Sequence, residues 1–122
     1  MADLSGMWLG TYWQQGIPTR FEISLLQGGN VLSGRILDDS NLGEAYLAGE
    51  VVGRKVNFMK RYLMRSQHVI LYTGTVSAEG DFMQGQWKMD WFETGNWEAH
   101  RKGDNLVFEQ QNRTQQDIIV PF

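Results

Sequence analysis

The sequence predicts an all-β protein, an antiparallel up-and-down barrel of about eight strands. Short segments rich in aromatic and apolar residues follow one another at even spacing, and turn-forming residues separate them. Glycine occurs 14 times and proline twice, so glycine makes most of the turns. No segment shows the periodicity of an amphipathic helix. A closed barrel is favoured over a sandwich because successive hairpins follow without a long crossover and closure leaves no exposed edge.

The expected strands end at recognisable turns. Gly28-Gly29-Asn30 and Gly53-Arg54 have the composition of tight hairpin turns, and Ala78-Glu79-Gly80 marks a third turn. Phe21 to Leu25 alternates strictly between apolar and polar residues, as a half-buried strand does. In chain order, the expected strands are 7–14, 21–25, 31–37, 45–52, 55–62, 68–76, 81–91 and 96–101.

Gly6-Met7-Trp8 near the start and Arg101 near the end predict the closed end of the barrel. A tryptophan on the first strand can plug the floor, and the glycine lets a neighbouring backbone approach. The guanidinium of Arg101, on the last strand, can lie over the indole as a cation–π cap. We expect Gly6, Trp8 and Arg101 to be structural.

Composition excludes several classes of function. The 122 residues fit one domain, with 42% hydrophobic and 20% charged residues. A net charge of −3 without a basic block argues against nucleic acid as the main partner. Without cysteine, disulfides and thiolate metal sites are excluded. No signal peptide or transmembrane segment is recognisable, so we expect a soluble cytoplasmic protein that does not insert into membranes.

The chain divides into a barrel domain, residues 1–103, and a polar C-terminal tail, residues 104–122. The tail is rich in glutamine and ends in the apolar cluster Ile118–Phe122. One interpretation is that this cluster docks on the barrel's own surface. The other is that it contacts another subunit or a partner protein.

A series of short motifs in this chain resembles that of the calycins, and within them most closely that of the avidin-like barrels. Each motif alone is common, but their order and spacing cover residues 6 to about 101. Lipocalins share the Gly-x-Trp motif and the terminal arginine, but usually add a helix after the barrel. The motifs are Gly6-Met7-Trp8, Val31–Gly34, Tyr46–Gly49, Val56–Tyr62, Tyr72–Thr75 and Gly85-Gln86-Trp87.

The resemblance implies an internal binding site, but one that does not suit biotin. Avidin-like proteins hold the ureido group with small inward polar side chains and box the rings with aromatic residues. This chain has aromatic residues at the corresponding positions, Phe58, Tyr72, Trp87 and Trp97. Each lost hydrogen bond to the ureido group would cost about 1–3 kcal/mol, so biotin is not expected to bind. At the biotin-reading positions this chain has Gly10, Gln14, Ile36, Asp38, His68, Ile70 and Asn105.

Strand alternation from Trp8 predicts which side chains face the interior. The resulting interior is mostly apolar, with a few polar groups. It is either a cavity for a small hydrophobic or aromatic ligand or a core completely filled by side chains. The residues expected to contact a ligand are Tyr12, Ile36, Asp38, Phe58, His68, Ile70, Tyr72, Trp87 and Trp97.

Catalytic chemistry is not predicted. His68 opens a strand near a barrel mouth, where it is either a rim residue or a ligand contact, and no metal-ligand cluster or cofactor motif accompanies it. Asp38-Asp39 fit ordinary turn chemistry as well as an inward position. A modest basic cluster between the fifth and sixth strands, Lys60-Arg61 with Arg65, either receives a ligand carboxylate or phosphate or belongs to a solvated loop, and the second interpretation is favoured. We therefore expect no enzyme.

Two functions remain open at this stage. The first is a non-enzymatic barrel that holds a small ligand inside. The second is an interaction or inhibitor barrel that acts through its outer wall, its loops or Ile118–Phe122. Apolar residues predicted on the outer face also suggest a homo-oligomer, a dimer or tetramer. These outward residues are Met7, Leu9, Trp13, Met59, Val69, Leu71 and Phe82.

Overall fold

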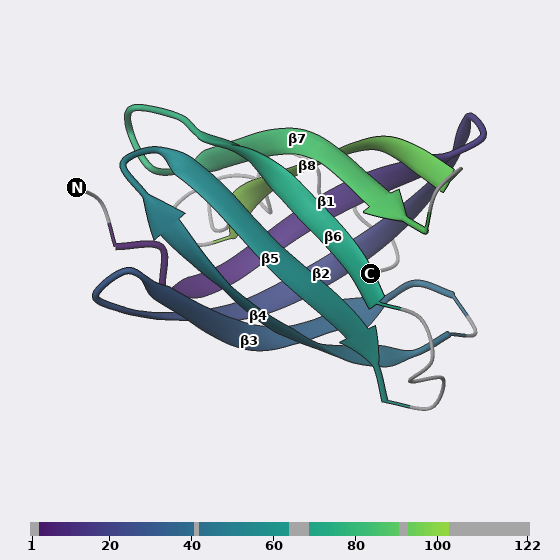
Figure 1. Cartoon of the computed structure of the whole chain (residues 1–122), viewed down its shortest axis with the longest axis horizontal. Helices are drawn as coiled ribbons and strands as arrows, with labels where there is room; N and C mark the ends of the chain where they lie inside the picture. Colours follow the sequence, from purple (N-terminus) through teal and green to yellow (C-terminus); the bar gives the residue numbers. More distant parts are fainter. Residues whose placement is uncertain (1–2, 41, 64–68, 91–92, 103–122) are drawn as a thin grey trace, which may run out of the picture.

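The protein is an eight-stranded antiparallel closed barrel, as the sequence predicts (Figure 1). A computed structural model describes residues 3–40, 42–63, 69–90 and 93–102. Each strand pairs with its neighbours in sequence, and β8 closes the barrel on β1. The strands are β1 (Gly6–Gln14), β2 (Ile17–Gly28), β3 (Val31–Asp38), β4 (Glu44–Val52), β5 (Lys55–Tyr62), β6 (Val69–Val76), β7 (Phe82–Met89) and β8 (Glu93–Lys102).

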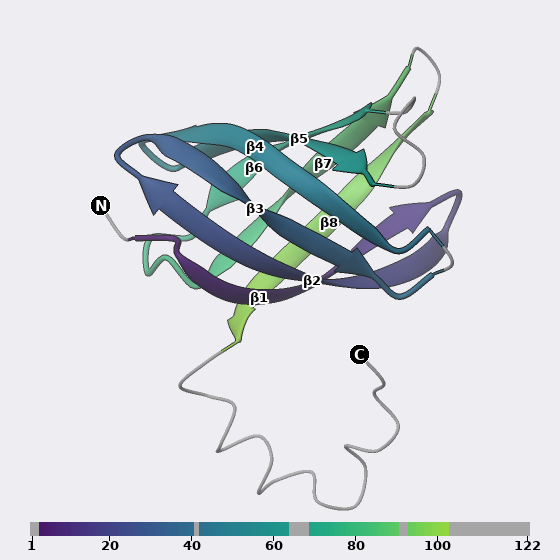
Figure 2. The same ribbon diagram turned by 90° about the horizontal axis from the view of Figure 1, so that it is seen from below.

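The up-and-down order gives the barrel two different ends. The N-terminal segment and the turns after β2, β4 and β6 lie at one end, on the left of Figure 1. Strands β1, β3, β5 and β7 end at the other end of the barrel, which we call the mouth. Figure 2 shows the same barrel from below, with β1 and β8 side by side. Each end is therefore built from residues far apart in the sequence.

Alternation along each strand fills the interior. In β1, Trp8 and Tyr12 are buried, whereas Leu9 and Trp13 between and beyond them are only half-buried. A glycine is required at position 85, because a Cβ there would collide with the Thr73 carbonyl oxygen of the adjacent strand. This close approach lets the sheet bend sharply enough to close.

Trp8 and Arg101, two of the three residues predicted at the floor of the barrel, lie against each other, and Leu4 joins them. Trp8 is fully buried, and its indole Nε1 donates to the Leu4 carbonyl oxygen at 2.9 Å. The Arg101 guanidinium lies 4.7 Å from the centroid of the Trp8 ring. It also donates to the carbonyl oxygens of Asp3, Ser5 and Gly80, each at 2.8 Å. The guanidinium thus ties the last strand to the N-terminal segment and to the turn before β7.

Three strands have boundaries that differ from the prediction by more than one residue. β8 begins at Glu93 rather than at 96, and β2 ends at Gly28 rather than at 25. β2 begins at Ile17 rather than at 21, because the stretch around Pro18 pairs with β1. This stretch has no partner on β3, whose pairing with β2 begins at Phe21, so the missing N–H of Pro18 interrupts no ladder there. β7 is shorter than expected and ends at Met89. His68, Arg65, Asn105 and the tail lie outside the described residues, and so do the expectations that rest on them.

Two of the seven apolar residues that alternation placed on the outer wall are exposed, and the other five are half-buried. Met59 is 54% exposed and Leu71, its register partner on β6, is 36% exposed. Within the described part of the chain, no helix is long and apolar enough to span a membrane.

Candidate functional site

A buried ion pair lies in the barrel interior toward the mouth. The Lys60 Nζ donates to both carboxylate oxygens of Asp38, at 2.9 and 3.0 Å. Neither side chain has any solvent-exposed surface. A buried pair of this kind is tolerated only when further hydrogen bonds satisfy the remaining lone pairs and protons.

Two tyrosines supply those hydrogen bonds. The Tyr12 hydroxyl donates to Oδ2 of Asp38 at 3.2 Å, and the Tyr62 hydroxyl donates to the same oxygen. The Lys60 ammonium lies 4.8 Å from the ring centroids of both tyrosines and 5.7 Å from that of Tyr72. The cation is therefore enclosed by aromatic rings on the sides that Asp38 leaves open. We call Asp38, Lys60, Tyr12 and Tyr62 the ion-pair cluster.

The expectation that Lys60 belongs to a solvated loop cluster is wrong. Lys60 lies within β5 and shares the inward face with Phe58 and Tyr62, whereas Arg61 points outward and is exposed. Asp38 is the last residue of β3 and is 4% exposed, so the turn interpretation fails for it too, whereas Asp39 is exposed. The alternation that placed Phe58 inward could have found both Lys60 and Tyr62.

Burial controls the protonation of the cluster. Desolvation, and then the nearby Asp38 charge, raise the pKa values of the Tyr12 and Tyr62 hydroxyls. The same two causes raise the pKa of Tyr72 well above its ordinary value. Burial lowers the pKa of Lys60, and Asp38 opposes that shift. All three tyrosines are therefore neutral hydrogen-bonding groups at physiological pH.

A small cavity opens at the mouth directly beside this cluster. Its volume is about 160 Å³. Tyr12 and Tyr62 belong both to the ion-pair cluster and to the cavity wall, so the cluster lies immediately behind the lining. The lining, which we call the mouth cavity, consists of Tyr12, Gln14, Leu42, Tyr62, Ile70, Tyr72, Trp87 and Met89.

The structure brings together only part of the predicted ligand-binding set. Tyr12, Ile70, Tyr72 and Trp87 line the mouth cavity, as a shared site requires. Sequence reasoning left Tyr62, Leu42 and Gln14 out of the site. Leu42 follows the β3 strand in a loop, where no periodic signal could have assigned it.

The other predicted residues lie elsewhere. Phe58 and Trp97 pack behind Tyr72, with ring centroids 4.9 and 5.5 Å from it, and they do not line the cavity. Ile36 is buried in the core, away from the lining. Phe58 and Trp97 support the wall rather than form it, because their rings pack against that of Tyr72 and fill the barrel's middle.

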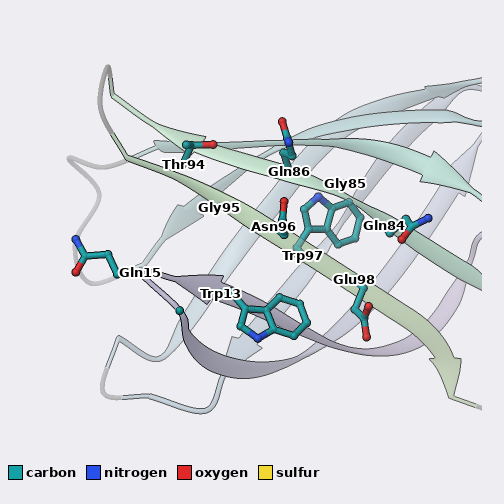
Figure 3. A pocket seen from close by; sticks show the side chains of 11 residues that line it. Trp13, Gln15, Gln84, Gly85, Gln86, Thr94, Gly95, Asn96, Trp97 and Glu98 are labelled. Atoms are coloured by element: carbon teal, nitrogen blue, oxygen red, sulfur yellow. The ribbon is translucent and has the colours of Figure 1, made fainter.

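A second hollow lies on the outside of the barrel, over β1, β7 and β8 (Figure 3). This open groove has a volume of about 840 Å³. Its walls include the half-buried Trp13 and the exposed Gln84, Gln86, Asn96 and Glu98. Because these polar side chains are already in contact with solvent, the groove lacks the desolvated polar anchors found at the mouth cavity.

Metal chemistry finds no support in the described residues. No group of three or more histidine, aspartate or glutamate side chains converges there. The carboxylate of Asp38 is instead neutralised by Lys60.

Solved structures show which architecture this chain shares. The sequence matches no family model and no curated protein. The fold is similar to a redesigned β-barrel, with a TM-score of 0.68, 10% identity, and coverage of 81% of this chain and 91% of that chain. A de novo designed fluorescence-activating β-barrel gives a TM-score of 0.63 and 16% identity, covering 84% of this chain and 100% of that one. A redesigned β-barrel bound to DFHBI gives a TM-score of 0.64 and 10% identity, covering 80% of this chain and 94% of that one. At these identities the similarity shows the fold alone.

Proposed function

We propose that this protein is a non-enzymatic barrel that binds a small, neutral, aromatic ligand in the mouth cavity. The observation that carries the proposal is an apolar, aromatic-walled cavity of about 160 Å³ beside polar groups that are already paired. Cavities of roughly 150 Å³ with an apolar lining bind benzene. The space therefore suits one aromatic ring.

The walls favour a flat ligand. Tyr12 and Trp87 meet edge to face, with centroids 6.3 Å apart, and Tyr72 completes an aromatic surround. Aromatic pairs in such arrangements contribute about 0.5–1.5 kcal/mol beyond the area that they bury. Barrels of similar fold include a fluorescence-activating design and one bound to DFHBI, which is consistent with a ligand in this place.

The charge distribution favours a neutral ligand. Asp38 and Lys60 neutralise each other within the wall, and a charged ligand would lose its hydration without gaining an unpaired counter-ion. The same pairing supports a non-enzymatic role, since the carboxylate and the amine are committed to each other rather than presented to a substrate.

A relationship to the avidin-like calycins is part of the proposal. The Trp8–Arg101 stack and the aromatic positions at Tyr72 and Trp87 support it. The buried Asp38 does not favour biotin, because Lys60 and the two tyrosine hydroxyls already donate to its carboxylate. Biotin is thus a negative control rather than a candidate ligand.

Calorimetric titration with toluene and biotin tests the proposal. We expect toluene to bind with a stoichiometry of one per barrel and biotin to give no heat. Ile70→Trp should abolish toluene binding, because Ile70 lines the cavity and a larger ring would fill it. Leu71→Trp is the matched control, since its side chain is on the outer wall. Equal toluene binding by both variants would place the ligand elsewhere, and no binding by the wild type would refute the proposal.

A further inference from the structure

We propose that the ligand of the mouth cavity carries a hydroxyl group on its ring, so that the cavity selects phenols over hydrocarbons of the same size. This inference rests on the proposed function and adds the chemical class of the ligand. It follows from which hydrogen-bonding groups near the cavity are already engaged and which are not.

The donors around the cavity are almost all committed to the protein. The Lys60 ammonium donates to both oxygens of Asp38, and the hydroxyls of Tyr12 and Tyr62 donate to Oδ2. The Trp87 indole Nε1 donates away from the cavity, to the Trp13 carbonyl oxygen at 3.0 Å. A ligand that only accepts hydrogen bonds, such as a carboxylate, would find few partners here.

Hydrogen-bond acceptors outnumber free donors on the side of the cluster that borders the cavity. A tyrosine hydroxyl has one hydrogen to donate and two lone pairs, so Tyr62 keeps acceptor capacity after it has donated to Asp38. The Tyr12 hydroxyl likewise donates its single hydrogen to Asp38 and keeps acceptor capacity. The side of the cluster that borders the cavity is therefore short of a donor.

Tyr72 adds a hydroxyl that is free to bond with a ligand. It lines the cavity, is 2% exposed, and its hydroxyl forms no hydrogen bond with any residue in the described part of the chain. Because Tyr72 lines the cavity, its hydroxyl can form a hydrogen bond with a bound ligand in place of water. A phenol matches this set because its hydroxyl donates to one tyrosine oxygen and accepts from the Tyr72 hydroxyl.

Charged alternatives do not fit the same groups. The Lys60 ammonium already occupies the ring faces of Tyr12, Tyr62 and Tyr72, so an ammonium ligand has no free aromatic face beside Asp38. An anion would meet Asp38 with its only counter-ion already engaged. A neutral hydroxyl is the group that this wall can receive without leaving a charge unpaired.

Calorimetric titration of the wild-type chain with phenol, anisole and toluene at neutral pH tests the inference. The three probes have one ring each, and phenol alone has a donor. We expect phenol to bind about tenfold more tightly than toluene, which is the ratio that one net hydrogen bond of ordinary strength gives. Anisole should bind less tightly than phenol, because its ether oxygen can accept from the Tyr72 hydroxyl but cannot donate to a tyrosine oxygen. A purely apolar cavity would give the reverse order, because burial would leave the phenol hydroxyl unpaired.

Tyr72→Phe identifies the group responsible. It removes a hydroxyl that no described residue binds, so the barrel should remain folded, and toluene affinity should stay the same. Phenol affinity should fall toward that of toluene. Tyr46→Phe is the control, because Tyr46 is half-exposed on the outer wall and should leave both affinities unchanged.

The outcomes separate the two proposals. Toluene binding at least as tight as phenol binding in the wild type would overturn the inference and leave the proposed function standing. So would an unchanged preference for phenol in both Tyr72→Phe and Tyr62→Phe. Failure of all three probes to bind would overturn the proposed function together with the inference.

Discussion

Both ends of this barrel place a cation over aromatic rings, yet they solve the problem of its charge differently. At the floor, Arg101 stacks on Trp8 and is held by three backbone carbonyl oxygens while remaining half-buried. Toward the mouth, Lys60 is completely buried and requires a carboxylate, Asp38, at 2.9 Å. Partial contact with water lets neutral dipoles suffice at the floor, whereas full burial demands a counter-ion.

The difference also separates structure from binding. At the floor, both the indole N–H and the guanidinium are engaged by the protein's own carbonyl groups. Around the mouth cavity, the Tyr72 hydroxyl is left over, together with space for one ring. Both ends share a cation whose hydrogen bonds are satisfied by the protein. Only the mouth adds a free hydrogen-bonding group beside a cavity.

Removing the buried cation should cause the largest loss. Lys60→Met leaves the Asp38 carboxylate buried without its counter-ion, which should lower the free energy of unfolding by about 3–5 kcal/mol. Adding Asp38→Asn removes the charge but keeps an acceptor for the hydroxyls of Tyr12 and Tyr62. The double variant should therefore be more stable than Lys60→Met alone. Urea denaturation of the wild type, both single variants and the double variant measures the coupling. Additive losses would show that the two charges act independently.

The free energy of unfolding should fall at alkaline pH because of the tyrosines near the mouth. Since the pKa values of Tyr12, Tyr62 and Tyr72 are raised above the ordinary value of 10.0, the unfolded chain loses these protons first as pH rises. Stability should thus fall above pH 10.0, by up to about 1.4 kcal/mol per pH unit for each tyrosine. The lowered pKa of folded Lys60 has the opposite effect, because it makes stability rise with pH. That rise ends above pH 10.5, the ordinary pKa of lysine, so it does not offset the loss from the tyrosines at higher pH.

Two variants test whether the buried tyrosines cause this loss of stability at alkaline pH. Tyr72→Phe should reduce the slope of unfolding free energy against pH by about 1.4 kcal/mol per unit between about pH 10.5 and pH 11.5. Arg101→Met, at the floor, should shift the whole curve downward without changing its slope. An unchanged slope in Tyr72→Phe would contradict the raised pKa of that hydroxyl.

The sequence predicted the floor better than the mouth, for a physical reason. Period-two alternation and the pairing of Trp8 with Arg101 depend on local pattern and on strand order, and both can be read directly. Lys60 was assigned to solvent by residue type, although its spacing from Phe58 placed it inward. The size of the mouth cavity depends on how Phe58, Tyr72 and Trp97 stack, which side-chain packing decides and strand pattern does not.

Arg101→Lys should cause the smallest loss and gives the sharpest contrast with Lys60. The variant keeps a cation near Trp8, but a single ammonium lacks the planar fork with which Arg101 reaches the carbonyl oxygens of Asp3, Ser5 and Gly80. We expect a loss of about 1 kcal/mol, because the half-exposed carbonyl groups can turn to water for their hydrogen bonds. Urea denaturation at low and high salt measures it, and the loss should be similar at both, since the partners of the guanidinium are neutral. A loss equal to that of Lys60→Met would mean that the floor cation is as dependent on its partners as the buried one, and the distinction between the two ends would fail.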